Sequence, residues 1–368
     1  MIQLSAIDLW HLCREIKSSL VDSKLDQIYQ YDAQTLLLRF HKTGAGKKEI
    51  LIHVPRALFE TAKKPPVARH LSFCSYLRKT IKGTYLTDMG ILGFSRKVYF
   101  TFTFKDKSYK LICEFYDKGN IILCSQNNDG QYIIDLPSQM QHWSSRTIKK
   151  GEAYEVEETK LPFELSQSEF YELISQGNKE GLTPSKFFAT KFKLGGFYGR
   201  YIIELLQIDD ATSLLTLDFN TVMVGLKTLF PEDASKLSPR AYVSKENSIK
   251  HTSHIAPFDV LSKKSSISGN SLSELLDAYY AEEETAEYED AKTRAFDAKV
   301  QKLKRILSSQ EKAKMKLSSR IEKSDEFAQK LQASAYEVDL LLQNYAKGKK
   351  DARIVSEDKK HKTIKVNI

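Results

Sequence analysis

The chain lacks the features that would assign it to a membrane or secreted class. Across its 368 residues, no apolar run approaches the roughly 20 residues that a membrane-spanning helix needs. The N-terminal segment carries charges at Asp8, Arg14 and Glu15, and it has neither the apolar core nor the small-residue cleavage site of a secretory signal. We therefore expect a cytoplasmic protein with no membrane partner.

Cysteine is scarce and catalytic motifs are missing. The four cysteines have no CxxC spacing and lie among apolar residues, which predicts buried, reduced thiols. His251 and His254 show HxxH spacing without a cysteine pair nearby, so no zinc site is predicted. GxSxG, Walker, HExxH and GxGxxG sequences do not occur. The sequence favours a binding protein over an enzyme, with no cofactor and no metal.

Positive charge, in contrast, is abundant and unevenly distributed. Residues 1–150 hold 23 Lys and Arg against 13 Asp and Glu, whereas the rest of the chain holds 33 against 34. A basic domain joined to a neutral body indicates a polyanionic partner for that domain. Charge alone also permits an anionic membrane surface, but no basic amphipathic helix with a large aromatic face supports one.

Residues 1–160 predict a mixed domain of sheet and helices. A helix over residues 5–20 starts with Ser5 and Asp8 in capping-box form, and capping alone would explain Asp8. The segment 55–61 is expected to leave the sheet. A helix is expected over residues 65–82, with Gly83 as its stop. Apolar alternation and continuous apolar runs predict strands at 24–31, 35–41, 48–54, 97–104, 108–115 and 119–124, with an edge strand at 131–136.

The helix predicted over residues 65–82 carries a basic face. Arg78 and Lys82 lie four residues apart, with Lys79 beside them. Tyr76 and Tyr85 are close enough in sequence to stack on bases there, as aromatic side chains do in many RNA sites. A solvated basic surface with packed tyrosines is the alternative interpretation.

A helical domain is predicted over residues 161–238. Within it, Leu194-Gly195-Gly196 forms a bend between two helical patterns, which resembles a helix-hairpin-helix. Glycine at such a bend lets backbone N–H groups approach a nucleic-acid phosphate. An ordinary helical linker domain would show the same pattern. Residues 239–285 are expected to return to the first domain through one or two strands, followed by a linker at 265–271 and a short helix at 272–280.

A long coiled-coil helix is predicted over residues 286–346, since neither Gly nor Pro occurs between residues 290 and 345. Apolar residues repeat there every seven positions, as in Leu303, Leu317 and Leu331. A single apolar seam requires a partner, either a return helix or a second chain. Residues 347–368 start a further element that ends abruptly, so we expect a natural or artificial truncation.

Several segments in combination resemble one family, the NFACT proteins, which include RqcH, NEMF and the fibronectin-binding protein A group. The resemblance covers the whole chain, and its first 125 residues are the most diagnostic. The matching segments are AIDLWHLCREIK with Asp8, KLDQIYQYDAQTLLLRF, PRALFET with Arg56, LSFCSYLRKTIKG, GFSRKVYFTF with Arg96, and EFYDKGNIIL with Asn120.

This resemblance implies a ribosome-associated quality-control factor. Such proteins bind a large ribosomal subunit obstructed by peptidyl-tRNA, and they recruit aminoacyl-tRNA, commonly alanyl-tRNA, for C-terminal tailing of the stalled nascent chain. By position, Asp8 and Arg96 match family residues implicated in tRNA engagement, and the planar fork of Arg96 suits a phosphate or base edge. Ser95 replaces the acidic residue that usually precedes this arginine, which favours binding over tailing. The residues expected to face tRNA or other RNA are Asp8, Arg56, Arg78, Lys79, Lys82, Ser95, Arg96, Lys97 and Asn120.

Two other functions match parts of the sequence less well. The N-terminal domain also resembles that of formamidopyrimidine-type DNA glycosylases, which use an N-terminal proline amine followed by an acidic residue. Here the chain begins Met1-Ile2-Gln3, which disfavours DNA repair. An adhesin-like surface protein, suggested by an older family name, disagrees with the missing secretion signal and the placement of charge.

Overall fold

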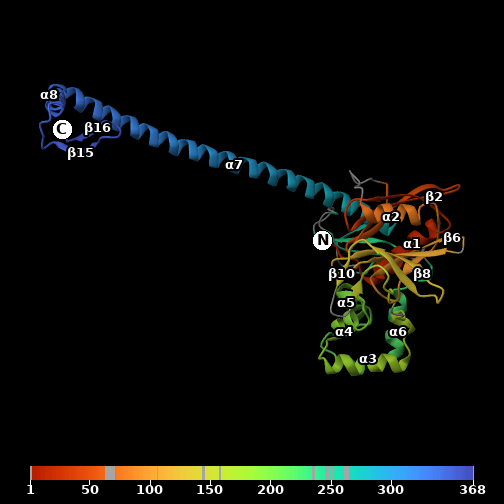
Figure 1. Cartoon of the computed structure of the whole chain (residues 1–368). Helices are drawn as coiled ribbons and strands as arrows, with labels where there is room; N and C mark the ends of the chain where they lie inside the picture. Colours follow the sequence, from red (N-terminus) through yellow and green to blue (C-terminus); the bar gives the residue numbers. More distant parts are fainter. Residues whose placement is uncertain are drawn as a thin grey trace. The chain divides into compact units, whose positions relative to one another are not determined.

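The computed structural model describes residues 2–62, 71–105, 107–142, 146–156, 159–233, 237–244, 249, 252–260 and 265–367, with side chains 284–297 left out. The chain divides into two compact units, residues 1–285 and residues 286–368 (Figure 1). The fold is α+β, with a large antiparallel sheet in the first unit.

The first unit is built on a nine-stranded antiparallel sheet in the order β4-β3-β2-β1-β5-β6-β7-β8-β9. The pair Lys24–Tyr85 joins β1 to β5, so the sheet consists of two meanders that meet at a short contact. The strands are β1 (Lys24–Gln30), β2 (Thr35–Lys42), β3 (Gly46–His53), β4 (Ala57–Thr61), β5 (Tyr85–Ile91), β6 (Lys97–Phe104), β7 (Lys107–Glu114), β8 (Asn120–Gln126) and β9 (Tyr132–Pro137).

Helix α1 (Ala6–Leu20) packs into the main core of this sheet through Leu9, Leu12 and Ile16, and α2 (Ser72–Thr80) packs there through Phe73 and Leu77. The helical residues 272–280 add further apolar side chains to the same core. A smaller apolar cluster around Ile112, Ile122 and Tyr154 packs with a two-stranded ribbon of β10 (Gln141–His142) and β11 (Thr147–Ile148). The apolar residues 111–113 of β7 and 121–124 of β8 are therefore covered on both faces, which explains why they are apolar without alternation.

Two local predictions were wrong. The segment 55–61 does not leave the sheet, because Leu58 and Phe59 are apolar enough to be buried and Ala57–Thr61 pair with β3 as an edge strand. The basic helix is shorter than predicted: Leu71 is extended, and the helix starts at Ser72. The prolines expected to open it lie at 65 and 66, outside the described residues.

Gly119 is a position where glycine is required. Its φ is +69°, and a Cβ there would lie 2.8 Å from the Pro55 nitrogen. We expect Gly119→Ala to lower the free energy of unfolding by about 2–4 kcal/mol, from left-handed strain plus displacement of the packed backbone. Urea unfolding measures this loss. Gly46 is the matched control: its φ is +82° with nothing within 4 Å of a Cβ, so Gly46→Ala should cost only about 1–2 kcal/mol. Equal losses in both variants would contradict the packing argument.

Four helices form a second core in the same unit, around Phe170, Phe187, Tyr198 and Leu226 (Figure 1). Ala6 and Ile7 of α1 belong to this core as well, so α1 joins the helices to the sheet. The helical elements are η1 (Pro162–Glu164), α3 (Gln167–Lys179), α4 (Pro184–Thr190), α5 (Gly195–Leu205), η2 (Leu214–Thr216) and α6 (Phe219–Thr228).

The return segment forms its own three-stranded sheet and does not extend the large one. Its strands are β12 (Arg240–Val243), β13 (Thr252–Ala256) and β14 (Ser266–Ser268). The third strand falls in the segment predicted as a linker, because Ile267 pairs with Ala241 and packs against the main core. Ala241 of β12 and Ile255 of β13 are buried in the main core of the first unit.

The helix predicted at 272–280 is the start of one continuous helix, α7 (Leu272–Ala333). Glu15 caps it, since its two carboxylate oxygens accept hydrogen bonds from the backbone N–H groups of Leu272 and Ser273 at 2.8 and 3.0 Å. The second unit contains the rest of α7, α8 (Ala335–Ala346), and a hairpin of β15 (Ile354–Asp358) and β16 (Thr363–Val366). Leu303, Leu317 and Leu331 are exposed, so the coiled-coil partner stays a prediction.

Candidate functional site

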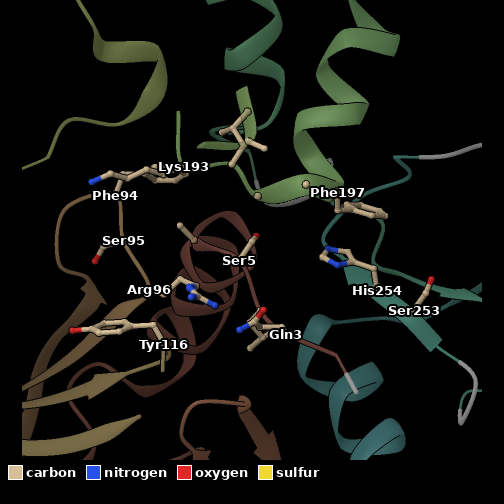
Figure 2. A pocket seen from close by; sticks show the side chains of 16 residues that line it. Gln3, Ser5, Phe94, Ser95, Arg96, Tyr116, Lys193, Phe197, Ser253 and His254 are labelled. Carbon is tan, nitrogen blue, oxygen red and sulfur yellow. The ribbon is translucent and has the colours of Figure 1, made fainter. Parts of the chain in front are cut away.

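A cleft of about 670 Å³ lies in the first unit where five segments converge. Figure 2 shows Arg96 and Tyr116 on one side of it, Phe197 and His254 on the other, and Gln3 and Ser5 between them. The segments are the approach to α1, the loop before β6, the β7–β8 turn, the start of α5, and β13. This cleft is the candidate functional site because charged groups and open backbone N–H groups meet in it.

Arg96 supplies the positive charge of one wall. Its side chain is half-buried, and burial lowers the pKa of its guanidinium, while nearby Asp117 and Tyr116 offset part of that effect. Within the described residues, the guanidinium makes no hydrogen bond or ion pair. An arginine stays charged in proteins, and a partly desolvated charge without a partner is unfavourable. Arg96 is therefore available to bind an anionic ligand.

The opposite wall is the start of α5. Leu194, at its N-cap, makes no side-chain capping bond within the described residues. Gly195 has φ +79°, and a Cβ on Gly196 would meet nothing within 4 Å. The first N–H groups of a helix lack intrahelical partners and carry the positive end of the helix dipole. Lys193 is exposed beside them, so this wall is also suited to an anion.

Tyr116 is held in the first wall by a buried polar network. The Glu114 carboxylate accepts hydrogen bonds from Arg146 Nη2 at 2.5 Å and from the Tyr154 hydroxyl at 2.6 Å. Arg146 Nη1 donates to the Tyr116 hydroxyl at 2.7 Å. Lys97 lies over the rings of Tyr116 and Tyr154, at 6.0 and 5.9 Å from their centroids. The network ties the β7–β8 turn to β11.

Ser95 and Lys97, predicted beside Arg96, are fixed by the same loop. The Ser95 hydroxyl donates to the Leu92 carbonyl at 2.7 Å, and the backbone N–H of Phe94 donates to the Thr159 hydroxyl at 2.6 Å. The loop before β6 is therefore anchored at two points. Ser95 lines the cleft but uses its hydroxyl internally, which leaves the charge of this wall to Arg96.

Two predicted residues are buried away from any ligand. Asp8 is 1% exposed and accepts hydrogen bonds from Ser5, which confirms the capping box. Asn120 is fully buried: its side-chain amide donates to the Gln139 carbonyl and to Gln141, and its side-chain oxygen accepts from the Ile121 N–H. In this structure neither can touch RNA directly, so any effect on binding passes through neighbouring residues.

The predicted basic face is divided by the structure. Arg78 turns inward, where its Nε and Nη2 donate to the Ile28 carbonyl at 2.8 and 2.5 Å. Lys79 lines a separate polar groove of about 800 Å³, which lies at the end of β7 and β8 that is away from the Arg96 cleft. Lys82, three residues after Lys79, is exposed. Arg56 is partly buried, close to Tyr279 and Tyr280 of α7. These four residues are not part of the cleft around Arg96.

Sequence reasoning missed one residue of the first wall, Tyr116, and most of the second wall. Lys193, Phe197 and His254 line the cleft there, and none of the four was singled out as a contact. The Gly195-Gly196 pair was the available signal, since it marks an open helix start. His254 stood out only through its spacing from His251, which is outside the described residues.

The described residues contain no cluster of three or more metal-ligating side chains. Among them, no helix is both long enough and apolar enough to span a bilayer.

The family model for NFACT N-terminal and middle domains matches residues 5–368. The archaeal Rqc2 homolog aRqcH of Methanocaldococcus jannaschii is 26% identical over 386 residues, which cover 98% of this chain and 55% of that protein. The ribosome quality control complex subunit NEMF of Homo sapiens is 32% identical over 135 residues, or 36% of this chain and 12% of that protein. The chain thus spans about half of the archaeal relative and a small part of the human one.

A solved structure agrees on the fold. The N-terminal part of the fibronectin/fibrinogen-binding protein from Streptococcus suis superposes with a TM-score of 0.58 at 20% identity, over 76% of this chain and 100% of that one. This structural similarity supports the fold of the first unit. At 20% sequence identity it supports no conclusion about function.

Proposed function

The chain belongs to the NFACT family, and from this premise we propose that it is a ribosome-associated quality-control factor that binds tRNA in the cleft around Arg96. The relatives named as ribosome quality control proteins support a role in that process, and the cationic cleft supports tRNA as the ligand. Further parts of the proposal are a cytoplasmic location, association with a large ribosomal subunit that carries peptidyl-tRNA, and a role in binding without catalysis.

One observation carries the RNA proposal: the half-buried guanidinium of Arg96, which pairs with no described residue, faces the start of α5 across a cleft. Phosphate binds well to both elements, because arginine offers a planar fork of donors and a helix start offers free N–H groups. The helices α4 and α5 form the hairpin, and Gly199 lets them pack closely, since a Cβ there would lie 2.6 Å from the Ser185 carbonyl oxygen. We assign this hairpin the role of a phosphate-binding helix-hairpin-helix.

Tailing of a nascent chain is the finer part of the proposal. Alanyl-tRNA is the expected aminoacyl-tRNA, and the apolar seam of α7 is expected to pair with another helix or chain. Ser95 contributes no negative charge beside Arg96, and its hydroxyl is used by the Leu92 carbonyl. For this chain, tRNA binding is therefore the primary activity proposed.

The salt dependence of tRNA binding tests the phosphate contact. Phosphate contacts release counterions, so the logarithm of affinity should fall linearly with the logarithm of salt concentration. Lys193→Ala removes one such contact and should reduce the slope by about 1. Lys179→Ala is the control, since this exposed lysine ends α3 and does not line the cleft. Identical slopes for the two variants would remove Lys193 from the site.

Co-sedimentation with ribosomal subunits tests the process. The protein should pellet with large subunits that carry peptidyl-tRNA and much less with vacant ones. Equal pelleting with both would count against a quality-control role, even if free tRNA binds. The glycosylase alternative predicts cleavage of lesion-containing duplex DNA, and neither relative named above is a glycosylase.

A further inference from the structure

Asp8 joins three elements behind the cleft. One carboxylate oxygen accepts hydrogen bonds from the Ser5 backbone N–H and hydroxyl at 2.8 and 2.7 Å. The other accepts a 2.5 Å hydrogen bond from the Tyr198 hydroxyl of α5. His254 Nε2, from β13, lies 3.4 Å from the same oxygen without the geometry of a hydrogen bond. A single side chain thus accepts hydrogen bonds from the start of α1 and from α5, and it lies beside β13.

The residues around Asp8 form the cleft wall. Ser5, Phe197 and His254 line the cleft, and the rings of Phe197 and His254 stack with centroids 3.8 Å apart (Figure 2). Tyr198 follows Phe197 and is fully buried. The first turn of α5 is therefore fastened through Tyr198 to the same carboxylate that approaches His254.

The carboxylate is held in its charged form. Burial alone would raise the pKa of Asp8, but the proximity of His254 and the hydrogen bonds from Tyr198 and Ser5 outweigh it, so the pKa is below its usual value. A buried hydrogen bond to a charged group is among the stronger polar interactions in a protein. The link between α1 and α5 is correspondingly firm.

We propose that Asp8, together with Tyr198 and His254, positions the start of α5 opposite Arg96, and that Asp8 does not itself contact RNA. This inference rests on the proposed tRNA binding and assigns the structural basis of that site. The spacing of the two cationic walls decides whether one RNA backbone can touch both. Losing the Asp8–Tyr198 link frees the first turn of α5 to move and weakens binding while every RNA-contacting group remains present.

A double-mutant cycle on tRNA affinity tests the proposal. Tyr198→Phe removes the hydrogen bond to Asp8, and Asp8→Asn removes the charge that strengthens it, so each should weaken binding roughly tenfold, and the double variant should be no weaker than Asp8→Asn alone. Tyr99→Phe is the matched control, since it removes a 2.8 Å phenol–carboxylate bond to Asp88 outside the cleft. It should leave affinity unchanged. Unchanged affinity in Tyr198→Phe, or additive losses in the double variant, would overturn the proposal.

A distance measurement separates positioning from stability and from the proposed function. Spin labels at Lys118→Cys in the β7–β8 turn and at Glu204→Cys in α5 report on the distance between these two elements, and the four native cysteines are buried. Asp8→Asn should broaden the distance distribution while circular dichroism stays native. If the wild-type protein binds no tRNA, the proposed function fails. The spin-label distances then still test whether Asp8 holds α5 in place. A distribution as narrow as that of wild type in Asp8→Asn would refute it.

Discussion

Replacing Arg96 with alanine should weaken tRNA binding about 10- to 100-fold at moderate salt, because a charge-assisted hydrogen bond contributes about 1.5–3 kcal/mol. The fold should survive, since the guanidinium makes no hydrogen bond or ion pair with any described residue and is already partly desolvated. Fluorescence anisotropy with labelled tRNA measures the affinity, and thermal unfolding measures the stability.

Lys105→Ala is the matched control for this prediction. Arg96 comes directly before β6 and Lys105 directly after it, so both variants lose one positive charge at opposite ends of the same strand. Lys105 is exposed and lies at the end of β6 that is away from the cleft. Removing its charge should change tRNA affinity less than threefold, a surface-charge effect of about 0.5 kcal/mol. If the two variants lose affinity equally, then net charge explains binding and the cleft does not.

Replacing Arg146 with methionine should destabilise the protein by about 3–5 kcal/mol, because it leaves a buried carboxylate without its cation. Glu114 is 1% exposed, and its partners are Arg146 and Tyr154. The β7–β8 turn that carries Tyr116 would lose its anchor at the same time, so tRNA affinity should fall as well. Urea unfolding by circular dichroism measures the stability.

The double variant Glu114→Gln, Arg146→Met separates the unpaired charge from lost packing. With the carboxylate removed, no charge stays buried, and at least half of the lost stability should return. Lys149→Met tests a surface pair for comparison: Lys149 and Glu152 are about half exposed at 3.1 Å, so its loss should cost about 0–1 kcal/mol. Equal destabilisation in the single and double variants would show that Arg146 acts through packing.

Much of the fold follows from local sequence. The capping box at Ser5 and Asp8, the alternating β6 and the apolar runs of β7 and β8 are near-neighbour patterns, and the structure has them where they were predicted. The errors arose where burial overrode local signals. The segment 55–61 was expected to leave the sheet, yet Leu58 and Phe59 are buried in the core and lie on an edge strand. The linker at 265–271 became a strand because β12 offered a partner.

The sequence by itself determined that the N-terminal domain is basic, that the chain bends at Gly195-Gly196, and that the segment around Arg96 resembles the NFACT family. Only the tertiary structure decided which charges can act together. Arg78, whose charge matched the RNA prediction, donates to a backbone carbonyl, and Asp8 is enclosed by Tyr198 and His254. The reason is physical: charge and spacing are local properties of a chain, whereas burial and the contact between Asp8 and Tyr198, 190 residues apart, depend on how separate elements pack.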